Sequence, residues 1–177
     1  MIEKILSDPI LLIATIAVFI SFMSIVIGGL SLKIQRTHNR KTVKPIGNII
    51  LSDYENLLAV NIKNTGVGPL IIKSLKVYND SGESKINIID WMPEHPDNLP
   101  WTSFFANATD FVLPPGQSLN IIELKTNTDI SNTFAEFRDQ VRKALCGLTI
   151  ELTYKDIYDK QMPTNQRDLE WFGRNVK

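Results

Sequence analysis

The feature that most constrains this chain is a stretch of 23 consecutive residues, 10–32, without a formal charge. As an α-helix, with a rise of about 1.5 Å per residue, this stretch would be roughly 34 Å long. The hydrocarbon core of a bilayer is about 30 Å thick. The sequence therefore predicts a single N-terminal transmembrane helix over residues 9–34.

The small and polar residues of this stretch recur at alternating intervals of three and four positions. They are Ala14, Ala17, Ser21, Ser24, Gly28 and Ser31. This spacing is the 3.5-residue period of helices that pack in a left-handed seam. Because lipid tails are as apolar as leucine, transmembrane helices associate through close backbone approach at such small residues. We call this line the seam and expect homo-oligomerisation along it.

Two other interpretations of the seam stay open. Serine hydroxyls and a glycine that face the axis of a ring of helices would line a narrow polar path, as in a simple pore. Alternatively, each hydroxyl bonds back to the carbonyl four residues earlier, and the alignment is a coincidence. A mere tether would tolerate Ser21→Leu and Gly28→Leu, whereas a packed or conducting assembly would not.

Charges on either side of the span predict its orientation. Five basic residues follow it: Lys33, Arg36, Arg40, Lys41 and Lys44. The positive-inside bias places them and the following chain in the cytoplasm, with residues 1–8 outside the inner membrane. Asp8 and Pro9 suit a helix start, since Asp caps and Pro has no N–H to leave unpaired. A cleaved signal peptide, the alternative, would have a shorter apolar region preceded by positive charge.

The remainder of the chain is a basic linker and an acidic domain. Residues 35–44 form the juxtamembrane linker, which we expect to lie against anionic lipid headgroups. Residues 45–177 suit one domain and contain 13 Lys and Arg against 17 Asp and Glu, a net charge of −4. Bulk nucleic-acid binding is therefore not expected. The single cysteine, Cys146, cannot form an internal disulfide and suits the cytosol.

Short apolar runs separated by turn residues predict that this domain is mainly β. We expect strands over residues 45–51, 57–64, 70–78, 86–91, 119–125 and 148–154, a short strand around Phe111 and a final run after residue 160. Between the second and third runs, Gly66 and Gly68 permit positive φ and Pro69 cannot donate to a ladder, which indicates a turn. Seven or eight short strands suggest a β-sandwich.

One helix is expected inside this β domain. Thr133 and Glu136 have the spacing of a capping box, and Gly147 is placed to end the helix. Apolar residues then recur on one face of the helix at Phe134, Phe137, Val141 and Leu145. Such a stripe predicts that this face of the helix is buried.

The turn chemistry resembles that of a known class of domain. The corner at Asn64, Gly66, Gly68 and Pro69, with the later segment at residues 113–118, is similar to corners of adhesion-type, immunoglobulin-like β-sandwiches of bacterial membrane-anchored proteins. The resemblance covers about half the domain; the inserted helix and the Pro-rich loop over residues 92–101 depart from it. It implies a binding or interaction module and carries over no catalytic residue.

The sequence offers little for catalysis. His38 and His95 are the two histidines, so a metal site or a Ser-His-Asp triad would have to be built around His95. The neighbouring Asp90, Glu94 and Asp97 lack the regular spacing and central glycine of a calcium loop. No nucleotide-binding, zinc-protease or esterase motif occurs. We therefore predict no enzyme activity, no metal and no cofactor.

Two further groups are candidate binding surfaces. Arg138, Arg142 and Lys143 cluster on the predicted helix and are a candidate site for an anionic ligand, although a solvated helix face has the same composition. Four aromatic residues bracket the Pro-rich loop: Trp91, Trp101, Phe104 and Phe105. We expect these aromatic side chains to be core rather than an exposed partner surface.

Together these features predict a non-enzymatic, membrane-anchored sensor or effector. Its cytosolic β-sandwich would sense an unidentified ligand or protein partner, and its helices would associate and form a ligand-gated pore that disrupts the membrane potential. This architecture is similar to single-pass membrane effectors of prokaryotic antiviral signalling. The alternative is a constitutive adaptor that presents the sandwich to a membrane complex. In a third hypothesis, an enzyme built around His95, His95→Ala would abolish the activity.

Overall fold

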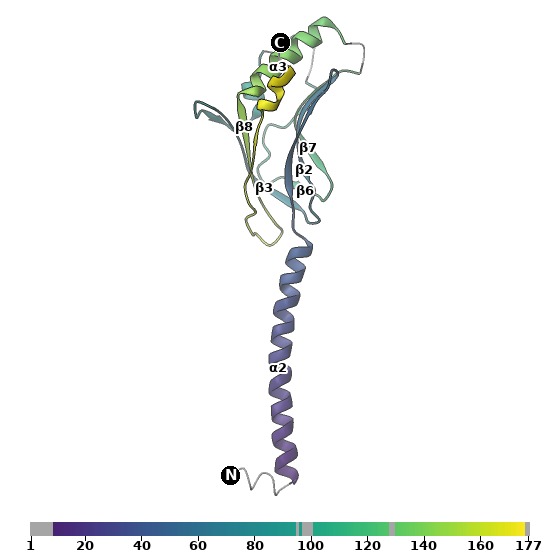
Figure 1. Ribbon diagram of the computed structural model, residues 1–177, viewed down its shortest axis with the longest axis vertical. Helices are drawn as coiled ribbons and strands as arrows, with labels where there is room; N and C mark the ends of the chain where they lie inside the picture. The colour runs from purple at the N-terminus through teal and green to yellow at the C-terminus, as the bar shows by residue number, and fades with distance from the viewer. Residues whose placement is uncertain (1–8, 95, 97–100, 128–129, 176–177) are drawn as a thin grey trace. The chain divides into compact units, whose positions relative to one another are not determined.

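The computed structural model describes residues 9–94, 96, 101–127 and 130–175. The chain divides into two compact units, Met1–Thr42 and Val43–Lys177. The first unit contains one long helix (Figure 1). The second unit, which we call the β domain, contains two antiparallel sheets, one α-helix and two short 3-10 helices.

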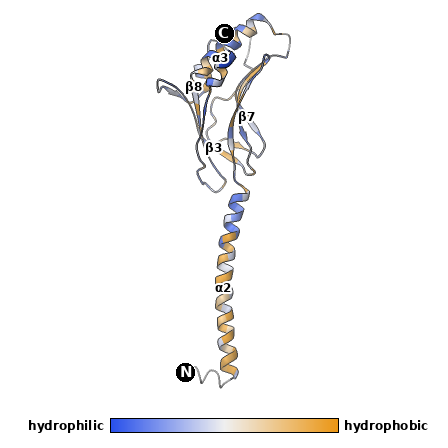
Figure 2. Cartoon of the chain, viewed as in Figure 1, coloured by the Kyte–Doolittle hydropathy of each residue, from blue (hydrophilic) through white to orange (hydrophobic). Residues whose placement is uncertain are grey.

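Helix α2 (Pro9–Thr42) is one continuous element. It begins at the predicted proline, while the predicted cap, Asp8, lies outside the described residues. Figure 2 shows it apolar along most of its length and hydrophilic towards its C-terminal end. The linker predicted over residues 35–44 is therefore mostly helical. No Gly or Pro occurs in residues 33–42, where Arg, Lys and Gln favour helix, and the position before Pro45 disfavours it.

The two antiparallel sheets of the β domain have separate strand orders. The first sheet is, in spatial order, β1 (Gly47–Asp53), β2 (Leu57–Asn64), β7 (Ser118–Lys125) and β5 (Ser103–Phe104). The second sheet is β4 (Ser84–Lys85), β3 (Leu70–Asn79), β8 (Leu148–Lys155) and β9 (Asn165–Asp168), with β6 (Val112–Leu113) also paired to β3. The predicted order of a long apolar helix followed by a mainly β domain is confirmed.

Both sheets contribute to one hydrophobic core. In β8, every second side chain is buried, as the predicted alternation requires: Leu148, Ile150, Leu152 and Tyr154. The first sheet adds buried side chains from its central strands, including Leu58, Val60, Ile62, Ile121, Ile122 and Leu124. All of them belong to a single cluster of buried residues. The sheets therefore form two layers around a shared interior.

Helix α3 (Asn132–Cys146) lies at one end of the sheets, beside the C-terminal 3-10 helix η2 (Glu170–Asn175) (Figure 1). The predicted apolar face of α3 is confirmed, because all four of its members are buried: Phe134, Phe137, Val141 and Leu145. They join the same core as the strands. Helix α3 thus covers the interior at that end.

The predicted start of α3 is wrong by two residues. The N-cap is Ser131 and not Thr133, and the Ser131 hydroxyl accepts a hydrogen bond from the Phe134 N–H at 3.2 Å. The earlier start adds a backbone bond, because the Ala135 N–H donates to the Ser131 carbonyl at 3.0 Å. The C-terminal prediction is confirmed, since the helix ends at its C-cap, Gly147.

The predicted corner between β2 and β3 is held by a buried amide. The Asn64 Nδ2 donates to the carbonyls of Gly68 (2.8 Å) and Leu113 (3.0 Å). Its Oδ1 accepts from the backbone N–H groups of Gly66 (3.0 Å) and Ile46 (3.3 Å). One side chain therefore ties together the corner, strand β6 and the first residues of the domain.

The two glycines of this corner serve close approach and not the positive φ that we predicted, which occurs at Gly82 and Gly116 instead. A Cβ at Gly66 would lie 2.4 Å from the Ile46 nitrogen, and one at Gly68 would lie 1.7 Å from the Val43 carbonyl oxygen. Only a residue without a side chain fits at either position.

The strand predicted over residues 86–91 is wrong. The two-residue strand β4 precedes this segment, and the 3-10 helix η1 (Ile88–Trp91) occupies most of it. In a 3-10 helix, residues three apart lie on one side, so the side chains of this segment do not alternate between two faces as they would in a strand. Side chains also favour the turn: the Lys85 Nζ donates to the Asp90 carbonyl (3.1 Å), and the Asn87 Nδ2 donates to the Asp90 carboxylate (3.2 Å).

Candidate functional site

Helix α2 is the one helix in the described part of the chain that is long and apolar enough to cross a membrane. None of its residues is buried. Exposure of such an apolar surface to water costs about 25 cal/mol of free energy per Å² of apolar area. The helix therefore requires an apolar environment, which lipid or other protein chains can provide.

The seam residues lie along one side of α2. The Ser21 hydroxyl donates to the Ala17 carbonyl, and the Ser24 hydroxyl donates to the Ile20 carbonyl, both at 2.8 Å. A Cβ at Gly28 would meet no atom within 4 Å, so the surface there is open. These two bonds are the back-bonding that the coincidence interpretation expects, while the open surface at Gly28 is what close approach of a second helix requires.

The repeat of the seam continues beyond the apolar stretch to the end of α2. In a heptad notation, positions a are Ala14, Ser21, Gly28, Gln35 and Thr42, and positions d are Ala17, Ser24, Ser31 and His38. We did not predict the last three members, Gln35, His38 and Thr42. Extending the spacing of the seam would have identified them. No Lys, Arg, Asp or Glu occupies an a or d position from Ala14 to Thr42.

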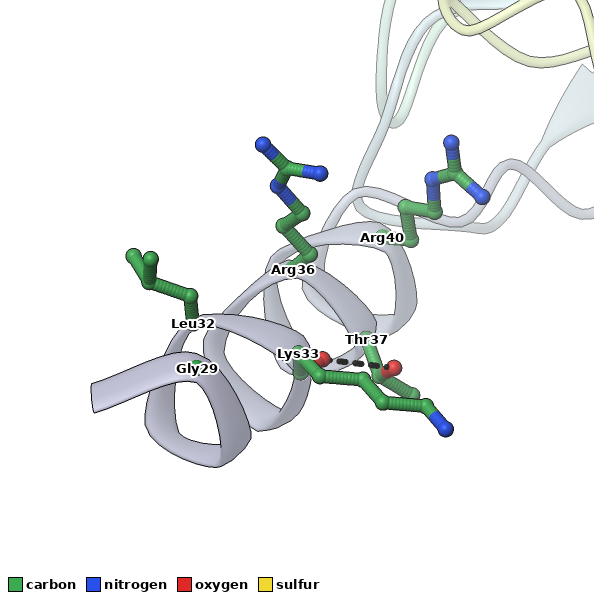
Figure 3. A pocket seen from close by; sticks show the side chains of 6 residues that line it. All are labelled: Gly29, Leu32, Lys33, Arg36, Thr37 and Arg40. Carbon is green, nitrogen blue, oxygen red and sulfur yellow. Dashed lines mark hydrogen bonds between the residues drawn. The ribbon is translucent and has the colours of Figure 1, made fainter. Parts of the chain in front are cut away.

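The basic residues of α2 lie away from this line. Lys33 and Arg40 occupy heptad positions f, and Arg36 occupies position b, the outward positions of a packed helix. Figure 3 shows Arg36 and Arg40 directed to the same side of the helix, while Lys33 extends past Thr37, whose hydroxyl donates to the Lys33 carbonyl at 3.0 Å. These side chains belong to the lining of a hollow of about 440 Å³.

The other two predicted basic residues lie elsewhere. Lys41 occupies position g and lines a separate hollow with Lys33 and His38. Lys44 follows the helix and belongs to the β domain, where its carbonyl accepts the Val67 N–H at 3.2 Å. The five basic residues therefore do not form one cluster. Three of them, Lys33, Arg36 and Arg40, line the same hollow.

The candidate anion site on α3 does not bring its three residues together. Arg142 is buried against β1, and its Nε and Nη2 donate to the Asp53 Oδ1 at 2.9 and 2.6 Å. Arg138 donates through Nη1 to the Glu55 carbonyl at 2.6 Å. Lys143 is exposed. We did not predict the pairing of Arg142 with Asp53, and anion binding at α3 stays a prediction.

The aromatic group around the Pro-rich loop is divided. Trp91, Trp101 and Phe105 pack against the core, as predicted, and the Phe105 and Phe111 rings meet edge to face at 5.2 Å. The prediction is wrong for Phe104, which is exposed. Phe104 belongs to the short strand β5, whose successive side chains point to opposite faces, so burial of Phe105 directs Phe104 outward.

The structure offers no metal centre in residues 9–94, 96, 101–127 and 130–175, where no three His, Cys, Asp or Glu side chains are grouped to hold an ion. His95 and Asp97 of the acidic loop lie outside these residues. At the surface of the β domain, the Lys73 Nζ donates to the Asp110 carboxylate at 2.6 Å and lowers the pKa of Asp110 below its ordinary value. This shift comes from an exposed ion pair and indicates no catalytic group.

The functional assignment of this protein depends on the geometric features described above. No protein-family model and no curated protein sequence matches this chain. What defines the protein is thus its architecture, a long apolar helix with a basic end, followed by a two-sheet β domain.

Proposed function

We propose that this protein is a single-pass membrane sensor or effector that assembles through α2. The helix would span the inner membrane with its N-terminus outside and its basic end in the cytoplasm, as the positive-inside bias indicates. The β domain would be the cytosolic part that binds a ligand or a protein partner. We infer an immunoglobulin-like sandwich for it, which its two antiparallel sheets around one core support.

The observation that carries this proposal is the separation of two faces along α2. The a and d positions hold small or uncharged polar residues over the whole length from Ala14 to Thr42, while Lys33, Arg36 and Arg40 occupy outward positions. A helix that serves only as a tether has no reason to exclude cations from one line beyond the apolar stretch. In an assembly, this exclusion keeps like charges out of the contact between copies.

Disulfide crosslinking tests the assembly. In full-length chain carrying Cys146→Ser and reconstituted in vesicles, Ser24→Cys at position d should give disulfide-linked dimer on oxidation. Val26→Cys, at the outward position f and at nearly the same depth, should give at least about fivefold less. Gel electrophoresis without reductant measures the two yields.

Equal crosslinking of the two cysteine variants would contradict the proposed seam. It would favour the adaptor alternative, in which the helix is a tether and copies meet only by collision. Failure of the chain to stay in the vesicle pellet at alkaline pH would contradict the membrane span itself. The Cys146→Ser background removes crosslinks through the one native cysteine.

Ion conduction through the assembled helices is a second candidate function. The observation that favours it is the polar character of the seam, with hydroxyls at Ser21, Ser24 and Ser31 followed by Gln35 and His38. In a ring of helices these groups would line the axis. Vesicles that contain the full chain should then release K⁺, and Ser24→Leu should reduce the initial rate at least about tenfold, since a bulky apolar side chain in place of a hydroxyl would block a narrow polar path.

Release of K⁺ that Ser24→Leu leaves unchanged would exclude this axis as the path. If Ser24→Cys crosslinks in vesicles that release no K⁺, conduction is excluded. The assembly would then act by bringing β domains together.

A further inference from the structure

We propose that the outward basic face of α2, formed by Gly29, Lys33, Arg36 and Arg40, binds the phosphate of an anionic phospholipid. This inference rests on the proposed membrane span. It goes beyond that span by assigning the lipid to one side of the helix, opposite the seam, rather than to a diffuse basic flank.

All the charged residues of the helix that carries this face are basic. The segment 9–42 contains no Asp or Glu. Arg36 and Arg40 are directed to the same side, one turn apart (Figure 3). Two guanidinium groups so placed present planar donors that match the oxygens of a phosphate. Lys33 also lines the hollow, and its flexible side chain extends past Thr37, away from the two guanidinium groups (Figure 3).

The hollow also has an apolar floor on the side of the span. Gly29 lies one turn before Lys33 and belongs to the lining together with Leu32. A Cβ at Gly29 would meet no atom within 4 Å, so the missing side chain leaves an open notch. A phospholipid combines a phosphate with an apolar chain on one side of it, and the hollow has the same order of apolar and basic groups.

The heights of the cations along the helix agree with a lipid headgroup. Lys33 is the first charged residue after the apolar stretch. Arg36 lies about 4.5 Å further along the helix axis, and Arg40 about 10.5 Å further. The headgroup layer of one leaflet is roughly 5–7 Å thick. Lys33 and Arg36 therefore fall within it, and the long side chain of Arg40 can extend back towards it.

The position of the face permits lipid binding and helix association at the same time. Lys33 and Arg40 occupy position f and Arg36 occupies position b, which face away from a partner that packs on positions a and d. In an assembly, each copy would therefore expose its basic face to lipid.

A variant that keeps the composition but scatters the charges tests the proposal. Two neighbouring exchanges do this: Lys33→Ile with Ile34→Lys, and Asn39→Arg with Arg40→Asn. The moved charges then occupy positions g and e, on different sides of the helix, and positions a and d are unchanged. The full native chain and this variant are reconstituted in phosphatidylcholine vesicles with spin-labelled phosphatidylglycerol or phosphatidylcholine.

Electron spin resonance then measures the lipid immobilised by each chain. We expect the native chain to prefer phosphatidylglycerol over phosphatidylcholine at least about threefold, and the scattered variant to retain less than half of that preference. An equal preference in the two chains would overturn the proposal, because total charge would then suffice. Loss of the native preference when inorganic phosphate replaces chloride at equal ionic strength would also overturn it, in favour of a soluble phosphate.

Crosslinking of Ser24→Cys in the same vesicles separates this inference from the proposed assembly. A lipid preference without crosslinking would refute the assembly and support the basic face. Crosslinking without a lipid preference would refute the basic face alone.

Discussion

Replacing Asp53 by Ala is expected to lower the free energy of unfolding of the β domain by about 3–5 kcal/mol, because it leaves a buried guanidinium without its carboxylate. The Asp53 side chain is 0% exposed and that of Arg142 is 7% exposed. The Asp53 Oδ1 accepts two hydrogen bonds from Arg142, and its Oδ2 accepts one from the Asn175 Nδ2 at 2.9 Å. Asp53 thereby joins the end of β1 to α3 and to the C-terminal segment.

Urea unfolding of the full chain in detergent micelles measures this loss through tryptophan fluorescence. All three tryptophans belong to the β domain, so the signal reports this unit. Asp139→Ala is the matched control, since Asp139 also accepts from Arg142, at 2.7 Å, but its side chain is 44% exposed. The control should lose at most about 1 kcal/mol.

A loss below about 1 kcal/mol for Asp53→Ala would show that water or another group replaces the carboxylate. A double variant, Asp53→Leu with Arg142→Met, provides a further test. It removes both charges and should be more stable than Asp53→Ala alone, because no unpaired ion remains in the interior.

Local pattern in the sequence predicts much of this fold. The alternation of Leu148, Ile150 and Leu152 corresponds to β8, and strand β2 has the predicted bounds, Leu57–Asn64. These predictions succeed because a strand with one buried face repeats its apolar residues every two positions. The same holds for the 3.6-residue stripe of α3.

Features that depend on distant partners could not be predicted in this way. Arg142 lies 89 positions from Asp53, so its spacing relative to Arg138 and Lys143 indicated a surface cluster, whereas burial pairs it with a carboxylate on β1. The strand prediction for residues 86–91 failed for a related reason. Its apolar residues fit a strand, but contacts of Lys85 with Asp90 favour a 3-10 turn.

The seam illustrates a third case, in which the sequence contained more than we predicted. The heptad spacing that ends at Ser31 in our prediction continues through Gln35, His38 and Thr42. Only the continuous helix to Thr42 makes this extension meaningful, since a spacing rule applies to residues that share one helix.

The corner between β2 and β3 leads to the second prediction with a large expected effect. The Asn64 amide and the backbone of residues 65–68 hold the first residues of the β domain, through the Thr65 N–H to the Ile46 carbonyl (2.8 Å) and the Val67 N–H to the Lys44 carbonyl (3.2 Å). Val43, which follows α2 directly in the chain, provides the atoms that a Cβ on Gly68 would meet first.

Replacing Gly68 by Ala should lower the free energy of unfolding by about 4 kcal/mol or more, because the new Cβ would lie 1.7 Å from the Val43 carbonyl oxygen and 2.5 Å from its carbon. Backbone atoms cannot move aside as a flexible side chain can, so the corner must separate from residues 43–46. Gly147→Ala is the matched control, since a Cβ there meets no atom within 4 Å and φ is −92°. It should change stability by at most about 1 kcal/mol. Equal urea midpoints for the two variants, measured by tryptophan fluorescence, would show that the corner yields without cost and that it does not hold the start of the domain.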